Sequence, residues 1–415
     1  MQQAFYLIYL AAAILLLHGC SSTEKAPTDQ EAVVAVDAEM LRHRLTTISA
    51  KAEQDASKLT FDSLAIPRSL LEDQSLDATK SKSWTSGFYP GTLWQLYRYS
   101  KNDALKAAAM TWQAPVEKEK HDSTTHDLGF KVFCPYGNAY RLTGNKTYQD
   151  IYVTAARTLS TRYNPNVGAL RSWDHHADVW DFPVIVDNMM NLELLFEATI
   201  STGDSTFYYI AEQHATTTLN NHFRSDNSSY HVVDYHPDSG EVEQRHTHQG
   251  AFHESAWARG QAWGLYGFTV AYRYTRKPEF LAQAQKIAQY FFNHANLPED
   301  LIPYWDFNAP NIPSEPRDVS AATIAASGLY ELATYDAAKA EQYMTWADQI
   351  LLSLEQQAYK TEAAPFFLAK SVGNAPAGSE IDVPIVYADY YYVEALLRRL
   401  ELEEQADKTR LSLKF

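Results

Sequence analysis

Apolar residues recur along this chain with the three- to four-residue spacing of helices. No long stretch alternates apolar and polar positions with the period of two that marks a half-buried strand. The pattern therefore predicts an all-α protein. About twelve segments carry it, and they span residues 39–57, 86–100, 102–115, 128–143, 146–162, 185–202, 204–223, 256–275, 277–296, 318–335, 337–357 and 383–402.

Several neighbouring segments meet at a similar junction. The first helix ends in an aromatic residue or leucine and a Thr or Ser, a short turn follows, and a second helix begins. Gly144 and Gly203 suit a helix C-terminus, and Asn145, Asp204 and Pro278 suit the N-terminus that follows. The instances are LYRYSKNDALKAAA, AYRLTGNKTYQDIY, ATISTGDSTFYYIA and AYRYTRKPEFLAQA.

Long loops separate these helical hairpins, at residues 116–127, 163–184, 224–255, 297–317 and 360–382. Six hairpins or so with long insertions predict an (α/α)6 barrel whose loops gather at one end and line a cleft. A solenoid of helical repeats is the alternative, but its repeats would be more uniform and its loops shorter. No break in composition follows residue 38, so residues 39–415 are predicted to form a single domain.

Composition and charge narrow the class of protein. Apolar residues make up 46% of the 415 residues, enough for a large core, so disorder is not expected. The net charge of −16 leaves no basic face to meet phosphates, which argues against a nucleic-acid partner. Many of the 27 tyrosines and 9 tryptophans are expected in the core, and a surplus of such rings suits stacking on sugars.

The N-terminal residues predict an exported protein. Residues 4–17 form an apolar run too short for a comfortable membrane span. It ends at Leu17-His18-Gly19-Cys20, and a polar tether follows to residue 38. This resembles a bacterial lipoprotein signal (residues 1–20) with Cys20 lipidated, although no Lys or Arg precedes the run and His18 replaces the usual small residue. An ordinary secretory signal is the alternative. With lipidation, the protein would sit in the periplasm or outer membrane and meet the membrane only through its anchor.

The stretch from Arg171 to Phe196 contains the most unusual polar residues. Asp187, Asn188 and Asn191 lie among Val, Ile, Met and Leu at the start of a predicted helix. Burying a carboxylate is costly unless it is paired or its pKa rises. Asp187 is therefore either a satisfied structural aspartate or a catalytic acid whose raised pKa suits proton donation near neutral pH.

A second aspartate, Asp127, follows His126 at the start of another predicted helix. The dipole and free N–H groups of a helix N-terminus favour a charged carboxylate there. Taken alone, Asp127 reads most simply as a structural cap. Together with Asp187 it would form a pair with one charged and one neutral carboxyl group, a pattern typical of acid/base chemistry on carbohydrates.

The segment WARGQAWGLYG (257–267) combines an arginine with two tryptophans. Arg259 and Trp263 share a face of the predicted helix at i, i+4. Arg259 could hold a uronate carboxylate while Trp257 and Trp263 stack on the sugar; an arginine packed structurally on tryptophan is the alternative. Another face carries the small residues Gly260, Gly264 and Gly267. These cost roughly 1 kcal/mol each relative to Ala, which close helix packing would offset.

Other loops carry candidate contacts. Trp84 in SWTSGFYPG could stack on a sugar or cover the core. His246 and His248 in RHTHQG are spaced i, i+2 rather than i, i+4, so polar contacts are favoured over a metal site. With only Cys20 and Cys134, neither a disulfide framework nor a cysteine-based zinc site is expected. The loop with Tyr304–Phe307 and Arg317-Asp318 is interpreted as barrel rim, and residues 370–382 as the side that receives a leaving group.

Six of these motifs, in order, resemble glycoside hydrolase family 88, the unsaturated glucuronyl hydrolases. They are SWTSGFYPG, HDLGF, VDNMMN, SYHVV, HTHQG and WARGQAWG. The resemblance covers roughly residues 80 to 400. The related family 105, which prefers unsaturated rhamnogalacturonan pieces, shares the fold and is the close competitor.

The resemblance implies an (α/α)6 barrel, no metal cofactor, and a substrate left by a polysaccharide lyase of glycosaminoglycan or ulvan type. That substrate ends in a uronic acid with a C4=C5 double bond. Asp187 matches the general acid/base and Asp127 the second catalytic carboxylate. The residues that match the sugar and carboxylate pocket are Trp84, His126, Trp173, His231, Gln249, Trp257, Arg259 and Trp263.

The implied chemistry explains why an acid would sit in a semi-buried place. The C4=C5 bond and the ring oxygen form a vinyl ether, and protonation of C4 gives C5 oxocarbenium character. Water then adds at C5, the hemiketal opens and the aglycone leaves. Two other classes stay open: a glycan-binding lipoprotein without activity, which would not need the paired aspartates, and an epimerase on the same barrel, which would use histidines as its acid and base.

Overall fold

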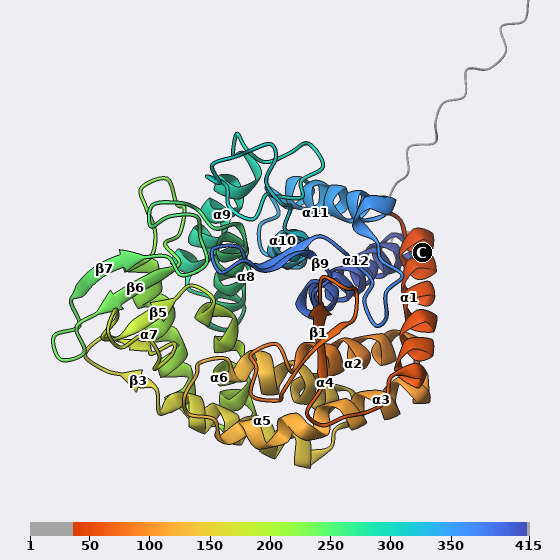
Figure 1. Cartoon of the computed structure of the whole chain (residues 1–415), viewed down its shortest axis with the longest axis horizontal. Coiled ribbons are helices and arrows are strands. Elements are labelled where there is room, and N and C mark those ends of the chain that lie inside the picture. Colours follow the sequence, from red (N-terminus) through yellow and green to blue (C-terminus); the bar gives the residue numbers. More distant parts are fainter. Residues whose placement is uncertain (1–35, 413–415) are drawn as a thin grey trace, which may run out of the picture. The chain divides into compact units, whose positions relative to one another are not determined.

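The computed structural model describes residues 36–412, with side chains up to residue 406. Within that range, twelve α-helices form two concentric rings (Figure 1). The inner ring consists of α2 (Phe88–Ser100), α4 (Cys134–Thr143), α6 (Asn188–Thr202), α8 (Ala258–Thr275), α10 (Val319–Ala333) and α12 (Val386–Ser412). The outer ring consists of α1 (Ala38–Lys58), α3 (Asp103–Gln113), α5 (Lys146–Ser160), α7 (Ser205–Asn221), α9 (Pro278–Phe292) and α11 (Ala340–Leu354). The predicted (α/α)6 barrel is confirmed.

Neighbouring inner helices pack on one another around the ring, except that α6 meets the π-helical turn Gly129–Phe133 ahead of α4, and α12 closes the ring by packing against both α10 and α2. Each outer helix packs on an inner neighbour. Two inner helices are buried nearly all round: every residue of α10 is buried, and so are residues 258–271 of α8. The outer helices instead have one buried face.

The predicted junctions between outer and inner helices are present. Asn102, Asn145 and Asp204 each accept a hydrogen bond from the backbone N–H two residues further on, at 2.8, 3.0 and 2.9 Å. Gly144 and Gly203 end α4 and α6 in the left-handed conformation (φ 66° and 77°), which glycine adopts without steric cost. These local signals explain why the helix boundaries follow the sequence closely.

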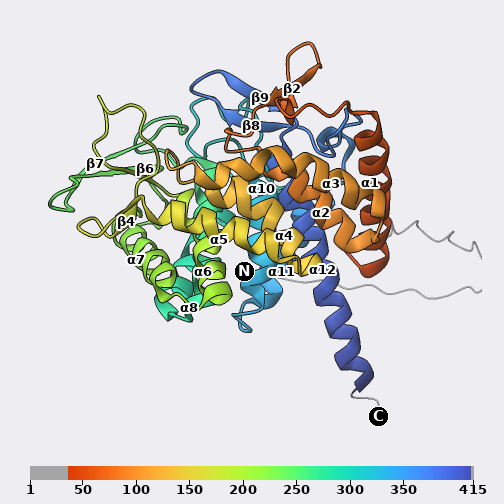
Figure 2. The same cartoon turned by 90° about the horizontal axis from the view of Figure 1, so that it is seen from below.

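Nine short strands in four small sheets, as far as residues 36–412 are concerned, were not predicted. They are β1 (Ile66–Leu70), β2 (Leu76–Thr79), β3 (Tyr163–Asn164), β4 (Ala169–Leu170), β5 (Pro183–Ile185), β6 (Val232–Tyr235), β7 (Val242–His246), β8 (Ser371–Asn374) and β9 (Ser379–Val383). At two to five residues each, they are too short to show an alternating pattern. They lie with the long loops at one end of the helical ring (Figure 2).

Two predicted helices begin later than expected for this reason. The segment predicted to be helical from residue 185 starts as β5, which pairs with β6, and α6 begins only at Asn188. The segment predicted from residue 383 starts in β9, and α12 begins at Val386. The segment predicted from residue 128 opens with a π-helical turn, Gly129–Phe133, before α4.

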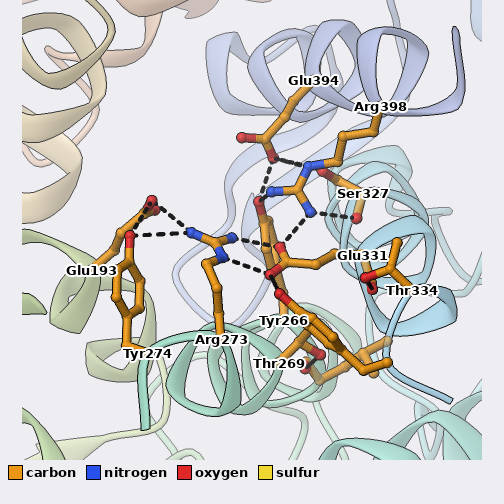
Figure 3. A network of polar contacts seen from close by, with 12 residues as sticks. Glu193, Tyr266, Thr269, Arg273, Tyr274, Ser327, Glu331, Thr334, Glu394 and Arg398 are labelled. Carbon is orange, nitrogen blue, oxygen red and sulfur yellow. Dashed lines mark hydrogen bonds and ion pairs between the residues drawn. The ribbon is translucent and has the colours of Figure 1, made fainter. Parts of the chain in front are cut away.

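The opposite end of the ring contains a network of half-buried ion pairs (Figure 3). The inner helices start at the end with the strands, so their last turns meet at the other end. There Glu331 of α10 accepts hydrogen bonds from Arg273 of α8 and Arg398 of α12 at 2.5–2.6 Å. Arg273 also donates to Glu193 of α6 at 2.8 Å. These side chains border a cavity of about 630 Å³.

The predicted signal (1–20) lies outside the described residues, as does nearly all of the tether (21–38), so both stay predictions. Among the helices that the structure describes, none is long and apolar enough to cross a bilayer. Cys134 is a free, buried cysteine at the start of α4.

Candidate active site

Asp187 lies at the strand-bearing end of the barrel, between β5 and α6. The backbone around it is held by the neighbouring loops, because Val186 N–H donates to His231 O (3.1 Å) and Ile185 N–H donates to Ser172 Oγ (2.9 Å). Asp187 is the N-cap residue of α6, yet its side chain accepts no capping hydrogen bond. The carboxylate is therefore free to serve something other than its own helix.

The surroundings of Asp187 favour its protonated form. The residue is 8% exposed, and its Oδ2 atom has no hydrogen-bond partner. Burial raises the pKa of Asp187 to about 7, against the opposing positive charges of Arg259 and His126, and the negative charge of Asp127 adds to the rise. An acid with this pKa is partly protonated near neutral pH, which suits general acid/base catalysis.

His231 faces Asp187 as a neutral imidazole. Its Nδ1 atom accepts hydrogen bonds from the backbone N–H groups of His248 and Gln249, both at 3.1 Å. Burial, together with the nearby His248 and Arg259, lowers the pKa of His231 well below its usual range. The single ring proton must therefore sit on Nε2, which lies 3.6 Å from Asp187 Oδ2.

Asp127 has the opposite character. Its Oδ2 atom accepts a hydrogen bond from Thr125 Oγ1 (2.6 Å), and its Oδ1 atom lies 3.0 Å from His126 Nε2. Burial acts to raise the pKa of Asp127, but His126, the Thr125 hydroxyl and Lys131 outweigh it and lower the pKa below its usual value. The two carboxyl groups thus differ in the direction of their pKa shifts, which is upward for Asp187 and downward for Asp127.

The side-chain amides of Asn188 and Asn191, next to Asp187, form structural hydrogen bonds. Asn191 Oδ1 accepts the backbone N–H of Phe130 at 3.0 Å, which joins α6 to the π-helical turn that follows Asp127. Asn188 Nδ2 donates to Leu170 O at 3.1 Å. These bonds fix the elements that carry Asp127 and Asp187 relative to each other, so the polar residues in the apolar stretch divide into one candidate acid and two positioning amides.

Arg259 is held inside the protein. It is 1% exposed, stacks over the Trp257 ring at 4.5 Å, and pairs with Asp318 at 3.2 Å. Its guanidinium also donates to the backbone carbonyls of β8, at Val372 and at Gly373 (2.6 Å). This is the packed arrangement that the sequence left as an alternative. Only Nε lacks a partner, and the role of Arg259 as a carboxylate clamp stays a prediction.

Asp318 and Tyr387 were not expected at the site. Asp318 was interpreted as barrel rim, but it is fully buried and caps α10 through Ser320 N–H (3.0 Å) while pairing with Arg259. The Asp-Val-Ser pattern of an N-cap was the available signal. The Tyr387 ring lies 5.2 Å from the Arg259 guanidinium and 4.9 Å from the Trp84 ring, and nothing in the local sequence singled it out.

The predicted tryptophans differ in exposure. Trp84 is half-buried and lies over Phe88, Phe130 and Tyr387, so it covers the core and keeps some free surface. Trp263 is fully buried against Phe130. Trp257 contacts His231 (ring centres 4.5 Å apart), and Trp173 pairs its backbone with Thr125 beside Asp127. Gln249 Nε2 donates to Gly373 O at 3.0 Å.

Several buried polar atoms of this region lack a hydrogen-bond partner. Because buried polar groups are normally hydrogen-bonded, their gathering in one place indicates a site for a polar ligand. They belong to His126, Trp173, Asp187, His231, Arg259, Trp263 and Tyr387. In the described part of the chain, no group of three or more His, Cys, Asp or Glu side chains is arranged to hold a metal ion.

Comparisons with known proteins agree on one family. No family model matches the chain. An unsaturated glucuronyl hydrolase of Formosa agariphila is 44% identical over 407 residues, which cover 97% of this chain and 99% of that protein. An unsaturated chondroitin disaccharide hydrolase of Streptococcus pyogenes is 32% identical over 80% of this chain and 85% of its own length. The chain belongs to the unsaturated glucuronyl hydrolases.

A crystal structure leads to the same family. It is that of an unsaturated glucuronyl hydrolase described as specific for heparin, with a TM-score of 0.85 and 42% sequence identity over 89% of this chain and 99% of the other. The chain is thus a glycoside hydrolase of family 88 that acts on unsaturated uronides, as the six motifs predicted. The rhamnogalacturonan-directed, binding-only and epimerase alternatives are not favoured.

Proposed function

We propose that this enzyme hydrates the C4=C5 bond of the unsaturated uronic acid at the non-reducing end of lyase-generated glycosaminoglycan oligosaccharides, with Asp187 as its acid. The observation that carries the proposal is the setting of Asp187. It is a buried carboxyl group whose pKa is raised to about 7 and whose Oδ2 atom is unbonded, and it lies beside a neutral histidine and a second carboxylate.

In this mechanism the protonated Asp187 donates its proton to C4 of the vinyl ether. C5 then carries oxocarbenium character shared with the ring oxygen. Asp187, now charged, takes a proton from the water that adds at C5. The resulting hemiketal opens, the hemiacetal at C1 collapses, and the aglycone leaves with its oxygen protonated. One residue serves as acid and base in turn, so the spacing rule for retaining and inverting carboxylate pairs does not apply.

The neighbouring residues support this cycle. His231 presents an N–H to the Asp187 side chain, which stabilises the carboxylate after it has lost its proton. Asp127 keeps its charge, so it can stabilise the positive charge that develops on the sugar ring. The unpaired N–H groups of Trp173 and Trp263 provide donors for hydroxyl or carboxylate oxygens.

Asp187→Asn tests the proposal. It keeps the shape of the side chain and removes the proton, so kcat should fall by about 10²–10⁴-fold. The measurement is the loss of ultraviolet absorbance of the double bond with lyase-made disaccharides. Asp238→Asn, at an exposed position in the turn between β6 and β7, is the matched control and should keep wild-type rates. Unchanged turnover by Asp187→Asn would contradict the assignment.

Two relatives suggest the source of the substrate. One is described as specific for heparin and another as acting on chondroitin disaccharides, so glycosaminoglycan fragments are the proposed class. Parallel assays with unsaturated disaccharides from heparin and from chondroitin distinguish the two. Activity confined to an unsaturated rhamnogalacturonan disaccharide would refute this class.

We also propose that the enzyme is exported and anchored through Cys20 in the periplasm or outer membrane. The support is the apolar run at residues 4–17 and the Leu17-His18-Gly19-Cys20 sequence. Replacing Cys20 by Ser should move the protein from the membrane fraction to the soluble fraction of a bacterial expression host. Equal distribution of the two proteins would count against a lipid anchor.

A further inference from the structure

The cavity at the opposite end of the barrel from Asp187 takes no part in the proposed mechanism. Its volume of about 630 Å³ is in the range of small-molecule sites in proteins. Residues of all six inner helices line it, and α12, which extends beyond the rest of the ring, forms one side (Figure 2). We call it the rear cavity, and its wall includes Gln95 on α2, Glu193 and Glu197 on α6, and Glu394 on α12.

The wall of the rear cavity carries more negative than positive charge. Five glutamates and four arginines line it. Each arginine is paired with at least one of these glutamates; the four are Arg98, Arg141, Arg273 and Arg398. Last-turn residues of α2, α4 and α8 lie in the same wall, and the C-terminal end of a helix carries about half an elementary negative charge. The rear cavity therefore favours a cation over an anion.

Three of these glutamates keep one carboxylate oxygen available for a ligand. Within the part of the chain that the structure describes, the hydrogen bonds that Glu193 and Glu197 accept end on their Oε1 atoms. Those that Glu394 accepts end on its Oε2 atom. Burial acts to raise the pKa of Glu193, but Arg273 and Arg141 outweigh it and lower the pKa, so this carboxylate stays charged.

Gln95 adds a buried acceptor to the same wall. Its side chain borders the rear cavity, the residue is 3% exposed, and its Oε1 atom has no hydrogen-bond partner. Because buried polar atoms are normally hydrogen-bonded, an unbonded acceptor beside a cavity indicates a donor that a ligand supplies. The available carboxylate oxygens and Gln95 Oε1 are all acceptors, so a ligand that satisfies them carries N–H donors together with positive charge.

The rest of the wall indicates the shape of such a ligand. Leu142, Leu397 and Leu402 line the rear cavity, and so do the rings of Tyr274 and Tyr330. The acceptors are spread over three helices, α2, α6 and α12, and these apolar groups share the wall with them. Ammonium groups joined by methylene chains match this mixture, because the ammonium groups bond to the acceptors while the methylene groups pack on leucine and tyrosine side chains.

We propose that the rear cavity is a binding site for an aliphatic di- or polyammonium cation. Its ammonium groups bond to Glu193, Glu197, Glu394 and Gln95, and its methylene groups pack on the apolar part of the wall. The bound cation links α2, α6 and α12, so it stabilises the end of the barrel at which the ion pairs gather. The inference stands apart from the proposed function, because the rear cavity and Asp187 lie at opposite ends of the ring.

Calorimetric titration of the protein with spermidine provides the first test. The wild type should bind one spermidine molecule. In Glu197→Gln the Kd should rise by about tenfold, because a hydrogen bond between charged groups is lost. Glu117→Gln, which removes an exposed glutamate outside the rear cavity, is the control and should bind as the wild type does. Absence of binding, or several weak sites that Glu197→Gln leaves unchanged, would overturn the site, the latter by showing attraction to the net charge alone.

Gln95→Met separates loss of binding from loss of folding. Methionine keeps the length of the side chain and removes the unbonded buried acceptor, so without spermidine the free energy of unfolding should stay at or above the wild-type value. The Kd for spermidine should nevertheless rise by about threefold or more. The increase in Tm that spermidine causes in the wild type should become smaller in this variant. Wild-type affinity in Gln95→Met would overturn the site as proposed.

Discussion

At the scale of single residues, Asp187 combines a catalytic advantage with a cost to folding. Burial raises the pKa of Asp187 to about 7, whereas an aspartate in the unfolded chain has its ordinary pKa of 3.8. Between these two pH values the folded protein holds a proton that the unfolded chain has released. The free energy of unfolding therefore decreases as pH rises through this interval. The same raised pKa keeps a protonated carboxyl group available for catalysis near neutral pH.

The pH dependence of activity follows from this. With Asp187 as proton donor, kcat/KM for an unsulfated disaccharide should fall above a pH of about 7, because the protonated carboxyl is lost there. Rate measurements between mildly acidic and mildly alkaline pH give this limb directly. If the residual activity of Asp187→Asn shows the same decrease above a pH of about 7, the decrease belongs to another titrating group.

The difference in stability between Asp187→Asn and the wild type should depend on pH. At pH 8 the amide avoids a buried charge, so the variant should be more stable than the wild type by up to about 4 kcal/mol, at about 1.4 kcal/mol per unit of pKa shift. At pH 4 the wild type is protonated and the difference should largely vanish. Urea unfolding at the two pH values measures it, and a constant difference would refute the raised pKa.

How far the sequence predicted these residues depends on how local their settings are. The odd position of Asp187 among Val and Met is visible in the chain itself, and so is the helix start beside Asp127. The neutral tautomer of His231 is not, because it depends on backbone N–H groups of residues 248 and 249 that only the folded loops bring near. The pairing of Arg259 with Asp318 is likewise a contact between distant elements.

At the scale of elements, the site depends on how closely α8 approaches α6. A Cβ atom at Gly267 would lie 2.4 Å from Met189 Cβ and 3.1 Å from the Met189 backbone, closer than atoms can pack. Met189 lies two residues after Asp187. The predicted strip of small residues on α8 thus has a structural purpose, which is to bring α8 against the first turn of the helix that carries the acid.

Gly267→Ala should therefore destabilise the protein by about 1–3 kcal/mol, the usual cost of overpacking, despite the better helix propensity of alanine. Gly264→Ala is the matched control. Its Cβ would meet the flexible end of Ile287 at 3.3 Å, so its stability should change by less than about 1 kcal/mol. Denaturant unfolding compares the two, and equal effects would show that the close approach is not the cause.

The helices were predictable and the strands were not, for the same physical reason. A helix of 15 residues such as α5 repeats its apolar face several times and begins after the capping residue Asn145. A strand such as β5 has three residues, all buried, and exists only because β6 lies beside it. Since β5 and β6 set the backbone of Asp187 and His231, the part of the fold nearest the candidate acid was the part that the pattern did not predict.

At the scale of the whole molecule, charges hold together the end of the barrel away from the site. Glu331 is bonded to Arg273 and Arg398, and Arg273 reaches Glu193, so one network joins α6, α8, α10 and α12. Burial acts to raise the pKa of Glu331, but the two guanidinium groups hold it well below the usual range. The sequence showed these charges but not their convergence, because they come from four helices.

Glu331→Gln should destabilise the protein by about 1–3 kcal/mol, because it removes the carboxylate that Arg273 and Arg398 share, while Glu193 still pairs with Arg273. The difference in stability between Glu331→Gln and the wild type should shrink as the pH falls below the usual pKa of glutamate. At such pH the unfolded wild-type chain takes up a proton on Glu331, and this uptake stabilises the unfolded state of the wild type. Glu401→Gln, which removes an exposed pair with Arg98, should cost less than about 1 kcal/mol. Thermal unfolding measures both. A small effect at Glu331 would mean that the network contributes little.

The position of α12 also bears on the order in which the molecule assembles. This helix fills the last gap of the inner ring, between α10 and α2, and Arg399 on it donates to the backbone of Val36 ahead of α1. During synthesis the apolar faces of α2 and α10 that α12 covers remain exposed until the segment from Val386 onward has left the ribosome. A nascent chain of this kind keeps these faces open until the segment of α12 has been made, and so offers chaperones a long period in which to bind.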